Sequence, residues 1–333
     1  MKVIVPLAGK GTRLLPLTKR VPKPLIRVAG RPVMDYVMDT LKGLDVEELI
    51  VITGHLKDVV ERYIVAHYPV KARFVEQKAL DGTAGAINLA RAFVDGPVLI
   101  VFVDTLFDAD MSLVRTSQAD GIIWAKEVED YKRFGVLVTD RHRLMTRIVE
   151  KPATPISRLA NIGLYYIRDW RTLFDGIAEV MRQPPGIGGE FYLTDAFQYM
   201  VDRGRKLQVA EVTGWYDCGT LDTVLETNHH LLEHGRARAP RPAPGVTIRL
   251  PVRIEDGVTL RDATIGPNVT IEAGSEVRES TIEDSILGRN VRVTRATVRG
   301  SLVGDGQAIE DKTVERSVVD AGDTDNERSA RER

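Results

Sequence analysis

The sequence predicts an α/β domain with a mostly parallel sheet and helices on both faces, followed by a parallel β-helix. Up to about residue 234, short β-branched runs alternate with helical patterns, which is typical of a sheet covered by helices. Beyond residue 245, aliphatic residues recur in steps of six and five, as in a coil that buries one such residue at each corner. Because 333 residues are long for one compact core, we expect two domains.

The elements of the first region follow from its apolar runs. Pro32 opens a helical pattern that extends to Leu41, at a position where a missing N–H costs nothing. Thr83 is a candidate cap for the helix that carries Ala86 and Ile87. This alternation indicates a Rossmann-like sheet, whose candidate strands are residues 2–7, 48–53, 72–76, 98–104, 121–127 and 161–167.

The second region begins after a proline-rich stretch. Residues 235–245 contain three prolines and cannot continue a helix, so we expect a semi-rigid linker there. The tail, residues 320–333, is charged and poor in apolar side chains, and we expect it to be disordered. The predicted domains are therefore residues 1–234 and 246–319, and the aliphatic repeat of the second includes Ile248, Ile254, Leu260, Ile265, Ile271, Val277, Ile282, Val293, Val298 and Val303.

Composition excludes several classes of protein. The 46 Lys and Arg residues nearly balance the 47 Asp and Glu residues, which argues against a nucleic-acid partner bound through a broad basic face. The chain starts with an apolar strand rather than a basic leader, and no apolar stretch reaches the roughly 20 residues of a bilayer span. We therefore expect a cytoplasmic protein with no membrane partner. The single cysteine, Cys218, excludes an internal disulfide and a cysteine-based zinc cluster, and we expect it to be buried.

The start of the chain carries the strongest signal for a ligand. The first apolar run breaks at Gly9 and Gly11, so a loop of small residues follows the first strand. Open α/β sheets bind ligands at this edge, where backbone N–H groups can meet phosphate oxygens. Arg13 and Lys23 add positive charge. The spacing differs from the P-loop and from the dinucleotide fingerprint, because Arg13 and Leu14 replace the third glycine.

A carboxylate is expected at the same sheet edge. Asp104 ends the apolar run 98–103, and a magnesium-nucleotide needs such a hard oxygen ligand. Far downstream, residues 215–220 read Trp-Tyr-Asp-Cys-Gly-Thr and contain a second aspartate, Asp217.

These motifs resemble those of the sugar-1-phosphate nucleotidyltransferases. The signature Gly-x-Gly-Thr-Arg-Leu with Pro-Lys-Pro-Leu stands at residues 9–14 and 22–25, and the resemblance covers nearly all of residues 1–230. It implies that the β-helix is left-handed and that Mg²⁺ is the cofactor, with Asp104 and Asp217 as its ligands. It also implies catalytic roles for Arg13 on the departing pyrophosphate and for Lys23 on the α-phosphate. Val103 stands where the family usually has glycine, a departure that bears on the metal geometry.

The resemblance also implies the groups that bind the nucleotide. Gln77 precedes Gly82-Thr83-Ala84 by five residues, and its carboxamide can pair with the O4 and N3–H edge of uracil or thymine. The guanylyltransferase branch usually carries an acidic residue at this position, although it shares Leu80 and the Gly-Thr-Ala-Gly run. Gln77 therefore favours dTTP or UTP. The implied nucleotide-binding residues are Leu7, Ala8, Gly9, Gly11, Thr12, Arg13, Gln77 and Gly82.

The sugar half of the site is implied in the same way. Gly135 and Glu150 would meet sugar hydroxyls, Lys151 the sugar phosphate, and Asn161 a hydroxyl or N-acetyl group. The implied reaction joins a hexose 1-phosphate, with glucose 1-phosphate as first choice, to the α-phosphorus of the nucleotide and releases pyrophosphate. N-acetylglucosamine 1-phosphate with UTP and mannose 1-phosphate with GTP remain alternatives.

Two further hypotheses concern the β-helix. A non-catalytic regulatory or scaffold protein could keep this fold, but the intact Arg13, Lys23, Asp104 and Asp217 argue against it. A bifunctional enzyme could transfer acetyl groups on the β-helix with a histidine base, but all six histidines lie at or before His234. We therefore interpret the β-helix as an assembly or regulatory module, and we expect a homo-oligomer.

Overall fold

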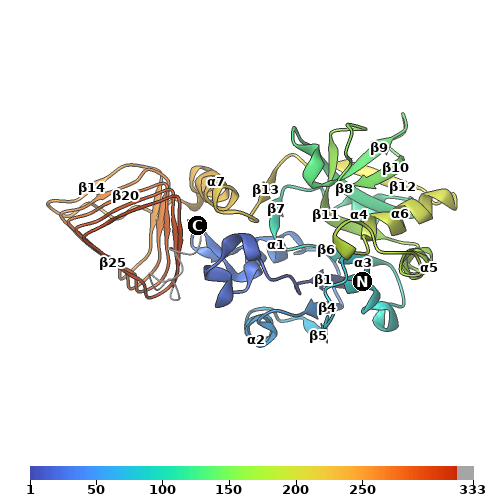
Figure 1. Ribbon diagram of the computed structural model, residues 1–333, viewed down its shortest axis with the longest axis horizontal. Helices are drawn as coiled ribbons and strands as arrows, with labels where there is room; N and C mark the ends of the chain where they lie inside the picture. The colour runs from blue at the N-terminus through green and yellow to red at the C-terminus, as the bar shows by residue number, and fades with distance from the viewer. Residues whose placement is uncertain (321–333) are drawn as a thin grey trace, which may run out of the picture. The chain divides into compact units, whose positions relative to one another are not determined.

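The computed structural model describes residues 1–320, and it divides the chain into two compact units (Figure 1). Unit 1 contains residues 1–9 and 37–215, and unit 2 contains residues 10–36 and the chain from Tyr216 onward. The division falls within helix α1 (Val33–Thr40) and strand β13 (Trp215–Asp217). These compact units differ from the predicted domains 1–234 and 246–319 and the predicted linker 235–245. The predicted boundaries remain a prediction. From residue 321 on, the predicted disordered tail lies outside the described residues.

Unit 1 is built on a nine-stranded mixed sheet. Its centre is parallel, because β1 pairs in parallel with β4 and β6, and β4 with β5. Strand β11 joins this centre to the rest through antiparallel pairs with β6, β8 and β9, while β10 pairs with β9 and β12 with β8. The strands are β1 (Lys2–Pro6), β4 (Glu48–Thr53), β5 (Lys71–Glu76), β6 (Val98–Val101), β8 (Gly121–Glu127), β9 (Gly135–Thr139), β10 (Met145–Glu150), β11 (Leu159–Ile167) and β12 (Leu207–Glu211), with β7 (Thr105–Phe107) outside this sheet.

Helices cover both faces of this sheet. Ile4 and Ile50 pack in one core with helices α3 (Thr83–Asn88), α5 (Trp170–Val180) and α6 (Leu193–Asp202). The intervening residues Val3 and Leu49 are also fully buried and point to the opposite face, because side chains alternate along a strand. Helix α2 (Lys57–His67) packs on β4 and β5 and buries Val60 and Ile64, and the short α4 spans Leu113–Thr116. The predicted α/β class is confirmed.

Local details correct three expectations. Strand β6 ends at Val101, so Asp104 lies in the connection that follows rather than at the strand's last position. Pro32 belongs to the short strand β3, and α1 begins at Val33. Thr83 is the first residue of α3 and does not cap it, because its hydroxyl accepts a hydrogen bond from Leu193 N at 2.9 Å. In each case a tertiary contact or sheet pairing competes with the local signal.

The C-terminal part of unit 2 is a parallel β-helix with three sheets as its walls (Figure 1). Val252 pairs with Val269, 17 residues on, and Leu302 pairs with Val318, 16 residues on. The three walls are β14 (Thr247–Ile248), β17 (Thr264–Ile265), β20 (Thr281–Glu283), β23 (Thr297–Arg299) and β26 (Thr313–Glu315); β15 (Val252–Ile254), β18 (Val269–Ile271), β21 (Ile286–Leu287), β24 (Leu302–Val303) and β27 (Val318–Val319); and β16 (Thr259–Arg261), β19 (Glu276–Arg278), β22 (Arg292–Thr294) and β25 (Ala308–Glu310).

The predicted repeat forms the core of this coil. Ile265, Ile271, Val277, Ile282 and Val293 are fully buried in one cluster, and Ile248 and Leu260 are partly buried and pack against it. Steps of six and five residues place each of them in a wall strand with its side chain in the core, where it packs on the equivalent residue of the next coil, as Ile265 does on Ile282 and Val277 on Val293. The expected β-helix is confirmed, and its left-handed winding remains a prediction.

Unit 2 also contains a segment from near the start of the chain. This segment, residues 10–36, forms the two-residue strands β2 (Arg27–Val28) and β3 (Arg31–Pro32) and three single 3-10 turns. Helix α7 (Leu221–Leu231) packs on β2 and β18. Part of the predicted linker joins the coil, since Arg238 N donates to Val252 O at 2.8 Å. The segment that carries Arg13 and Lys23 therefore shares a compact unit with the β-helix.

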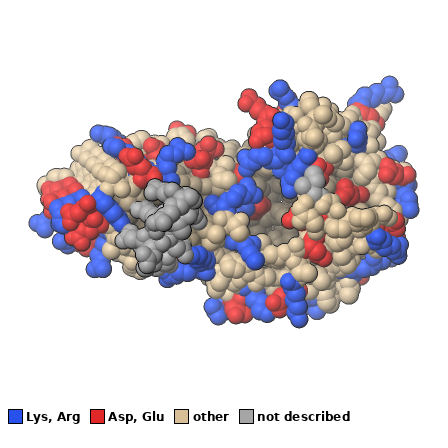
Figure 2. Space-filling model, in the orientation of Figure 1, with Lys and Arg blue, Asp and Glu red and all other residues tan. Residues whose placement is uncertain are grey.

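The remaining sequence expectations concern surface and burial. Basic and acidic side chains are mixed over the face that Figure 2 shows, as the balanced composition predicts. Through residue 320, we find no helix with the length and apolar character needed to cross a membrane. Cys218 is 1% exposed and unbonded to another cysteine, as expected.

Candidate active site

The predicted site residues fall into two groups, one in each compact unit. Leu7, Ala8, Gly9, Gln77, Gly82, Asp104, Gly135, Glu150, Lys151 and Asn161 belong to unit 1, while Gly11, Thr12, Arg13, Lys23 and Asp217 belong to unit 2.

Topology brings the unit 1 group to one edge of the sheet. Strands β1, β4, β5 and β6 are parallel, so the residues after them, including Gly9, Gln77 and Asp104, follow the same edge. Strand β11 runs the other way, which returns Asn161 to this edge, and Phe102 N donates to Gly163 O at 2.9 Å there. Residues far apart in the sequence thus converge because the parallel strands share a direction.

The residues after β1 are held by the backbone of the neighbouring strand. Leu7 N donates to Ile52 O at 2.7 Å, and the side chains of Leu7 and Ala8 are buried. Ala8 lies against Gly54, where an added methyl group would come within 2.9 Å of the Ala8 backbone. Gly9 is exposed with open space beside its Cα. The loop therefore exposes Gly9 while Leu7 and Ala8 fix where it begins.

Gln77 lies directly after β5 with an oriented amide. Its Nε2 donates to Asp81 Oδ1 at 3.0 Å and to Gly82 O at 3.3 Å, and the residue is 8% exposed. These two bonds occupy both amide hydrogens, so Oε1 is the side-chain atom that can accept a hydrogen bond from a ligand. Gly82 has a φ of 107°, and a methyl group there would lie 2.6 Å from Phe191 N. Gly82 is thus required by close backbone packing.

The sugar-binding prediction has the tightest cluster. Asn161 Nδ2 donates to Gly135 O at 2.9 Å, and the hydroxyl of the buried Tyr165 donates to Asn161 Oδ1. A methyl group on Gly135 would lie 2.7 Å from Glu150 Oε2 and would overlap the Asn161 amide. Strand pairing sets this geometry, because Glu150 pairs with Gly135 across β10 and β9. Gly135 therefore leaves room for two polar side chains at one point.

Burial changes the acidity of this cluster. Burial raises the pKa of Glu150, although the adjacent Lys151 and the Thr194 hydroxyl, 3.3 Å away, act in the opposite direction. Burial also raises the pKa of Asp195. The pKa of Tyr165 is raised by burial first and then by the negative charges of Glu150 and Asp104, so this phenol stays protonated as a donor.

A cation and a pocket adjoin the cluster. Lys151 adopts a φ of 44°, uncommon for a residue with a side chain, and its Nζ lies 5.2 Å from the centre of the Tyr192 ring. A pocket of about 480 Å³ is lined by Arg147, Glu150, Tyr192, Asp195 and Gln198 among others. Of the cluster, Glu150 thus lines a hollow in unit 1.

Asp104 is the predicted metal ligand that belongs to unit 1. The side chain of the preceding Val103 is 2% exposed, and the following Thr105 has a buried hydroxyl without a hydrogen-bond partner in residues 1–320. In that same part of the chain, we find no group of three or more His, Cys, Asp or Glu side chains arranged for a metal. Mg²⁺ at nucleotide sites commonly takes one or two carboxylates and completes its shell with phosphate oxygens and waters, so the Asp104 carboxylate is a donor of the kind that this ion takes.

In unit 2, the glycine loop closes on Lys23. Gly11 has a φ of 63°, and its carbonyl accepts from Thr18 Oγ1 at 2.9 Å. A methyl group on Gly11 would lie 3.3 Å from Lys23 Cβ, so glycine is required by both conformation and space. Arg13, in the 3-10 turn Thr12–Leu14, is exposed together with Thr12. The two predicted catalytic cations thus belong to one compact loop.

Asp217 stands before helix α7. Its carbonyl accepts from Thr227 Oγ1 at 3.0 Å, and a methyl group on Gly219 would lie 2.9 Å from Asp217 Oδ1. Thr220 caps α7 in a reciprocal pair with Thr223. The Trp-x-Asp-x-Gly-Thr motif therefore combines a carboxylate, a glycine beside it and a helix cap.

Sequence reasoning missed two supporting residues. Tyr165 orients Asn161, and Asp81 orients Gln77. Each lies four residues after its partner, a spacing that could have indicated contact, but only the strand bulge around Gly163 and the turn after Gln77 bring the pairs together.

The fold and these clusters define an α/β nucleotide-handling enzyme with a β-helix module. Residues 2–234 match the family model described as nucleotidyl transferase, which covers more than half of the chain. The chain belongs to this nucleotidyl transferase family, and the predicted family is confirmed.

Several curated proteins are similar to the chain. A bifunctional protein GlmU from Methanococcus aeolicus is 29% identical over 90% of this chain and 76% of its own length. A glucose-1-phosphate thymidylyltransferase from Streptomyces griseus is 26% identical over 90% and 81%. A UTP–glucose-1-phosphate uridylyltransferase, AglF, from Haloferax volcanii is 29% identical over 65% and 89%. These relatives support sugar-1-phosphate nucleotidyl transfer as the type of reaction.

Solved structures support the fold. A UDP-glucose pyrophosphorylase complexed with UDP-glucose superposes with a TM-score of 0.61 at 24% identity, over 70% of this chain and 98% of that one. The apo form gives a TM-score of 0.62 over the same shares.

Proposed function

We propose that this protein transfers the nucleotidyl group of dTTP or UTP to a hexose 1-phosphate, with glucose 1-phosphate as first choice. The observation that carries the proposal is the cluster of Glu150, Asn161 and Gly135 beside Lys151. A half-buried carboxylate and an oriented amide offer an acceptor and a donor to neighbouring sugar hydroxyls, and an ammonium suits a phosphate. Relatives named for uridylyl and thymidylyl transfer to glucose 1-phosphate support this choice.

In the proposed reaction, a phosphate oxygen of the sugar phosphate attacks the α-phosphorus. The bond from this phosphorus to the bridging oxygen breaks, and pyrophosphate leaves with that oxygen, so no covalent enzyme intermediate is required. Lys23 would contact the α-phosphate and Arg13 the departing pyrophosphate. Catalysis then consists of positioning and charge neutralisation.

Asp104 and Asp217 would hold Mg²⁺. Both offer the hard carboxylate oxygens that this ion prefers. When bound with the nucleotide, Mg²⁺ neutralises charge on its phosphates. The cytoplasmic location, homo-oligomeric assembly and regulatory role of the β-helix remain proposals of the same kind.

For the base, we propose that Gln77 Oε1 accepts from N3–H of uracil or thymine. Donation to O4 would require its amide to leave Asp81 or Gly82. An acceptor alone also suits N1–H of guanine, so guanylyl transfer to mannose 1-phosphate remains an alternative. The Asn161 amide can also meet an N-acetyl group, so N-acetylglucosamine 1-phosphate remains an alternative sugar substrate.

A substrate panel tests the proposal. Pyrophosphate release is measured with dTTP, UTP and GTP, each against glucose, N-acetylglucosamine and mannose 1-phosphates. The proposal expects the highest kcat/KM with dTTP or UTP and glucose 1-phosphate. A preference for GTP with mannose 1-phosphate, or for UTP with N-acetylglucosamine 1-phosphate, would transfer the assignment to that alternative.

A further inference from the structure

One column of the β-helix departs from its repeat. The residues that follow β15, β18, β21 and β24 are Glu255, Glu272, Gly288 and Gly304, and Asp320 follows β27. They are in register, because Glu255 N donates to Ile271 O, Glu272 N to Leu287 O, Gly288 N to Val303 O and Gly304 N to Val319 O, at 2.7 to 3.0 Å. We call these five residues the acidic–glycine column.

Segment 10–36 packs along this column within unit 2. Arg27 Nη2 lies 2.9 Å from Glu272 Oε2, and Arg20 Nη1 lies 3.5 Å from Asp320 Oδ1. A methyl group on Gly304 would lie 3.1 Å from Leu17 Cδ1. Three of the five column residues therefore contact the segment: Glu272 and Asp320 through their carboxylates, and Gly304 where Leu17 approaches.

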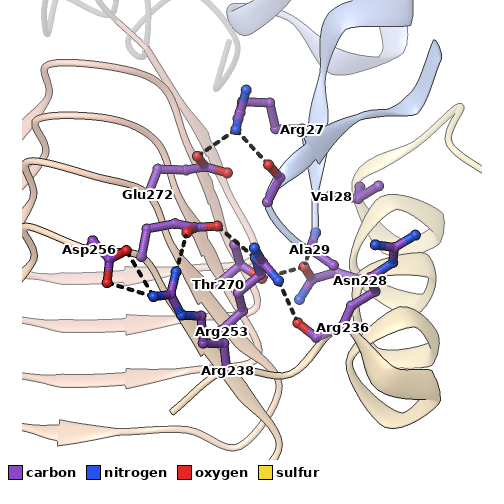
Figure 3. A network of polar contacts seen from close by, with 12 residues as sticks. Arg27, Val28, Ala29, Asn228, Arg236, Arg238, Arg253, Asp256, Thr270 and Glu272 are labelled. Carbon is purple, nitrogen blue, oxygen red and sulfur yellow. Dashed lines mark hydrogen bonds and ion pairs between the residues drawn. The ribbon is translucent and has the colours of Figure 1, made fainter. Parts of the chain in front are cut away.

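The contact between Arg27 and Glu272 is the most deeply buried part of this match (Figure 3). The Glu272 side chain is 2% exposed, and Arg27 also donates to Gly30 O at 2.6 Å. Arg27 Nε and Glu272 Oε1 have no further hydrogen-bond partner among residues 1–320. A buried ion pair of this kind adds little net stability compared with apolar packing, but breaking it leaves an uncompensated charge, so it enforces one geometry.

A group of hydrogen bonds around Asn228 lies beside this ion pair. Ala29 N donates to Asn228 Oδ1 at 2.9 Å, and Thr270 Oγ1 donates to the same oxygen at 2.7 Å. Asn228 is fully buried, and its Nδ2 donates to Asn268 O at 3.2 Å. Helix α7 thus joins residues 27–29 to the coil that carries Glu272 (Figure 3).

Residues 27–29, which these contacts hold, are close in sequence to the predicted phosphate-binding cations. Lys23 precedes Arg27 by one 3-10 turn, Lys23–Leu25, and Pro22 and Pro24 restrict the backbone on both sides of it. Gly11 packs against Lys23 Cβ, which connects the loop of Arg13 to the same turn. The turn and the Gly11 contact therefore connect Arg27 to the segment that carries both cations.

We propose that the β-helix positions the phosphate-binding segment, with Glu272 as a positioning residue that fixes Lys23 and Arg13 through Arg27. This inference rests on the proposed function of those two cations. It assigns the coil a role in the transfer reaction itself, although none of the predicted catalytic residues belongs to the coil.

The test compares Glu272→Gln with Glu283→Gln in the full chain. Glu283 also carries a coil ion pair, with Arg299 at 2.9 Å, but both partners belong to the β-helix. Amide hydrogen exchange is measured for residues 10–36, for the coil strands and for unit 1, and kcat and KM are measured for both substrates. For Glu272→Gln we expect about tenfold faster exchange in residues 10–36 alone and about tenfold lower kcat, with an unchanged KM for the sugar phosphate. Glu283→Gln should match the wild type.

Three results would overturn the proposal: unchanged exchange in residues 10–36, faster exchange confined to the coil strands, or a changed KM for the sugar phosphate with unchanged kcat. If Glu272→Gln does not fold, Arg27→Lys replaces it, and unchanged exchange in residues 10–36 would again reject the proposal. A wild type without transferase activity would contradict the proposed function instead, while the exchange arm would still decide whether Glu272 orders the segment.

Discussion

The sheet of unit 1 and the β-helix of unit 2 bury similar aliphatic cores but arrange polar residues differently. In unit 1, strands of different sequence end at one edge, and each brings a different group there, such as Gln77, Asp104 and Asn161. In the β-helix, each coil repeats the previous one, and equivalent positions carry similar residues, such as the threonines at 264, 281, 297 and 313. The sheet therefore brings chemically different side chains together at one edge, whereas the coil presents a regular surface of similar side chains.

The acidic–glycine column is an instructive exception. There the coil loses its repetition, and there segment 10–36 packs against it. In a repetitive structure, a position that departs from the repeat indicates a contact with a segment outside the coil, because stacking of the coils does not require the different residue. The following predictions test this contrast, with Glu272→Gln as the case in which the coil itself matters.

The largest effect is expected for the carboxylates. Asp104→Asn and Asp217→Asn should each lower turnover by roughly a hundredfold or more, because a neutral amide is a poor Mg²⁺ ligand. Pyrophosphate release at saturating Mg²⁺ measures this effect. The control is Asp108→Asn, an exposed aspartate four residues after Asp104. Near wild-type turnover in either variant would remove that residue from the metal site.

A smaller effect on activity should accompany a gain in stability for Glu150→Gln. Loss of hydrogen bonds to a charged group, about 1.5 to 3 kcal/mol, should lower kcat/KM for the sugar phosphate by roughly tenfold to a hundredfold. Burial raises the pKa of Glu150, so the favourable contribution of its protonated form is present at low pH and is lost as pH rises through the folded pKa.

The glutamine variant cannot ionise, and its unfolding temperature should therefore exceed that of the wild type at pH 7 and approach it near pH 4. The acidic limb that Glu150 adds to the pH profile of kcat/KM should also disappear. Thermal unfolding at both pH values checks the sign, and a lower unfolding temperature at pH 7 would contradict it.

Gln77→Glu should change base selectivity. A carboxylate near a pyrimidine carbonyl and beside Asp81 should cost roughly 1 to 3 kcal/mol, so use of dTTP and UTP should fall by one to two orders of magnitude, while GTP loses less. The measured quantity is the ratio of kcat/KM for dTTP to that for GTP. An unchanged ratio would show that Gln77 does not contact the base.

The smallest effect is expected on the coil surface. Arg295 pairs with Asp311 at 2.6 Å and lowers the pKa of that carboxyl, so any stabilisation is present at neutral pH and is lost in acid. Solvent screens this exposed pair, and Arg295→Gln should leave both activity and the unfolding temperature unchanged at physiological salt. The unfolding temperature is measured at low and high salt. A clear drop in the variant would show that this exposed ion pair of the coil surface contributes to stability, contrary to the prediction.

Periodicity and motifs are enough to predict the class of both folds and to select most of the candidate residues. The register of the β-helix could be predicted because its aliphatic spacing directly encodes coil length, and the strands of unit 1 because buried parallel strands are short continuous apolar runs. Motifs such as Gly-x-Gly-Thr-Arg-Leu identify groups by type, so Gly11, Arg13 and Lys23 could be selected without coordinates.

Which groups meet depends on the tertiary structure. The Asn161 contact with Gly135 and the Leu193 bond that removes Thr83 from its capping role depend on packing between distant segments. The orientation of Gln77 by Asp81 depends on the turn that follows Gln77. The same holds for segment 10–36, which local patterns assign to the sheet domain but which packs on the acidic–glycine column. Local sequence encodes dihedral preference and burial periodicity, whereas a contact between Arg27 and Glu272, 245 residues apart, exists only once the chain has closed that long loop.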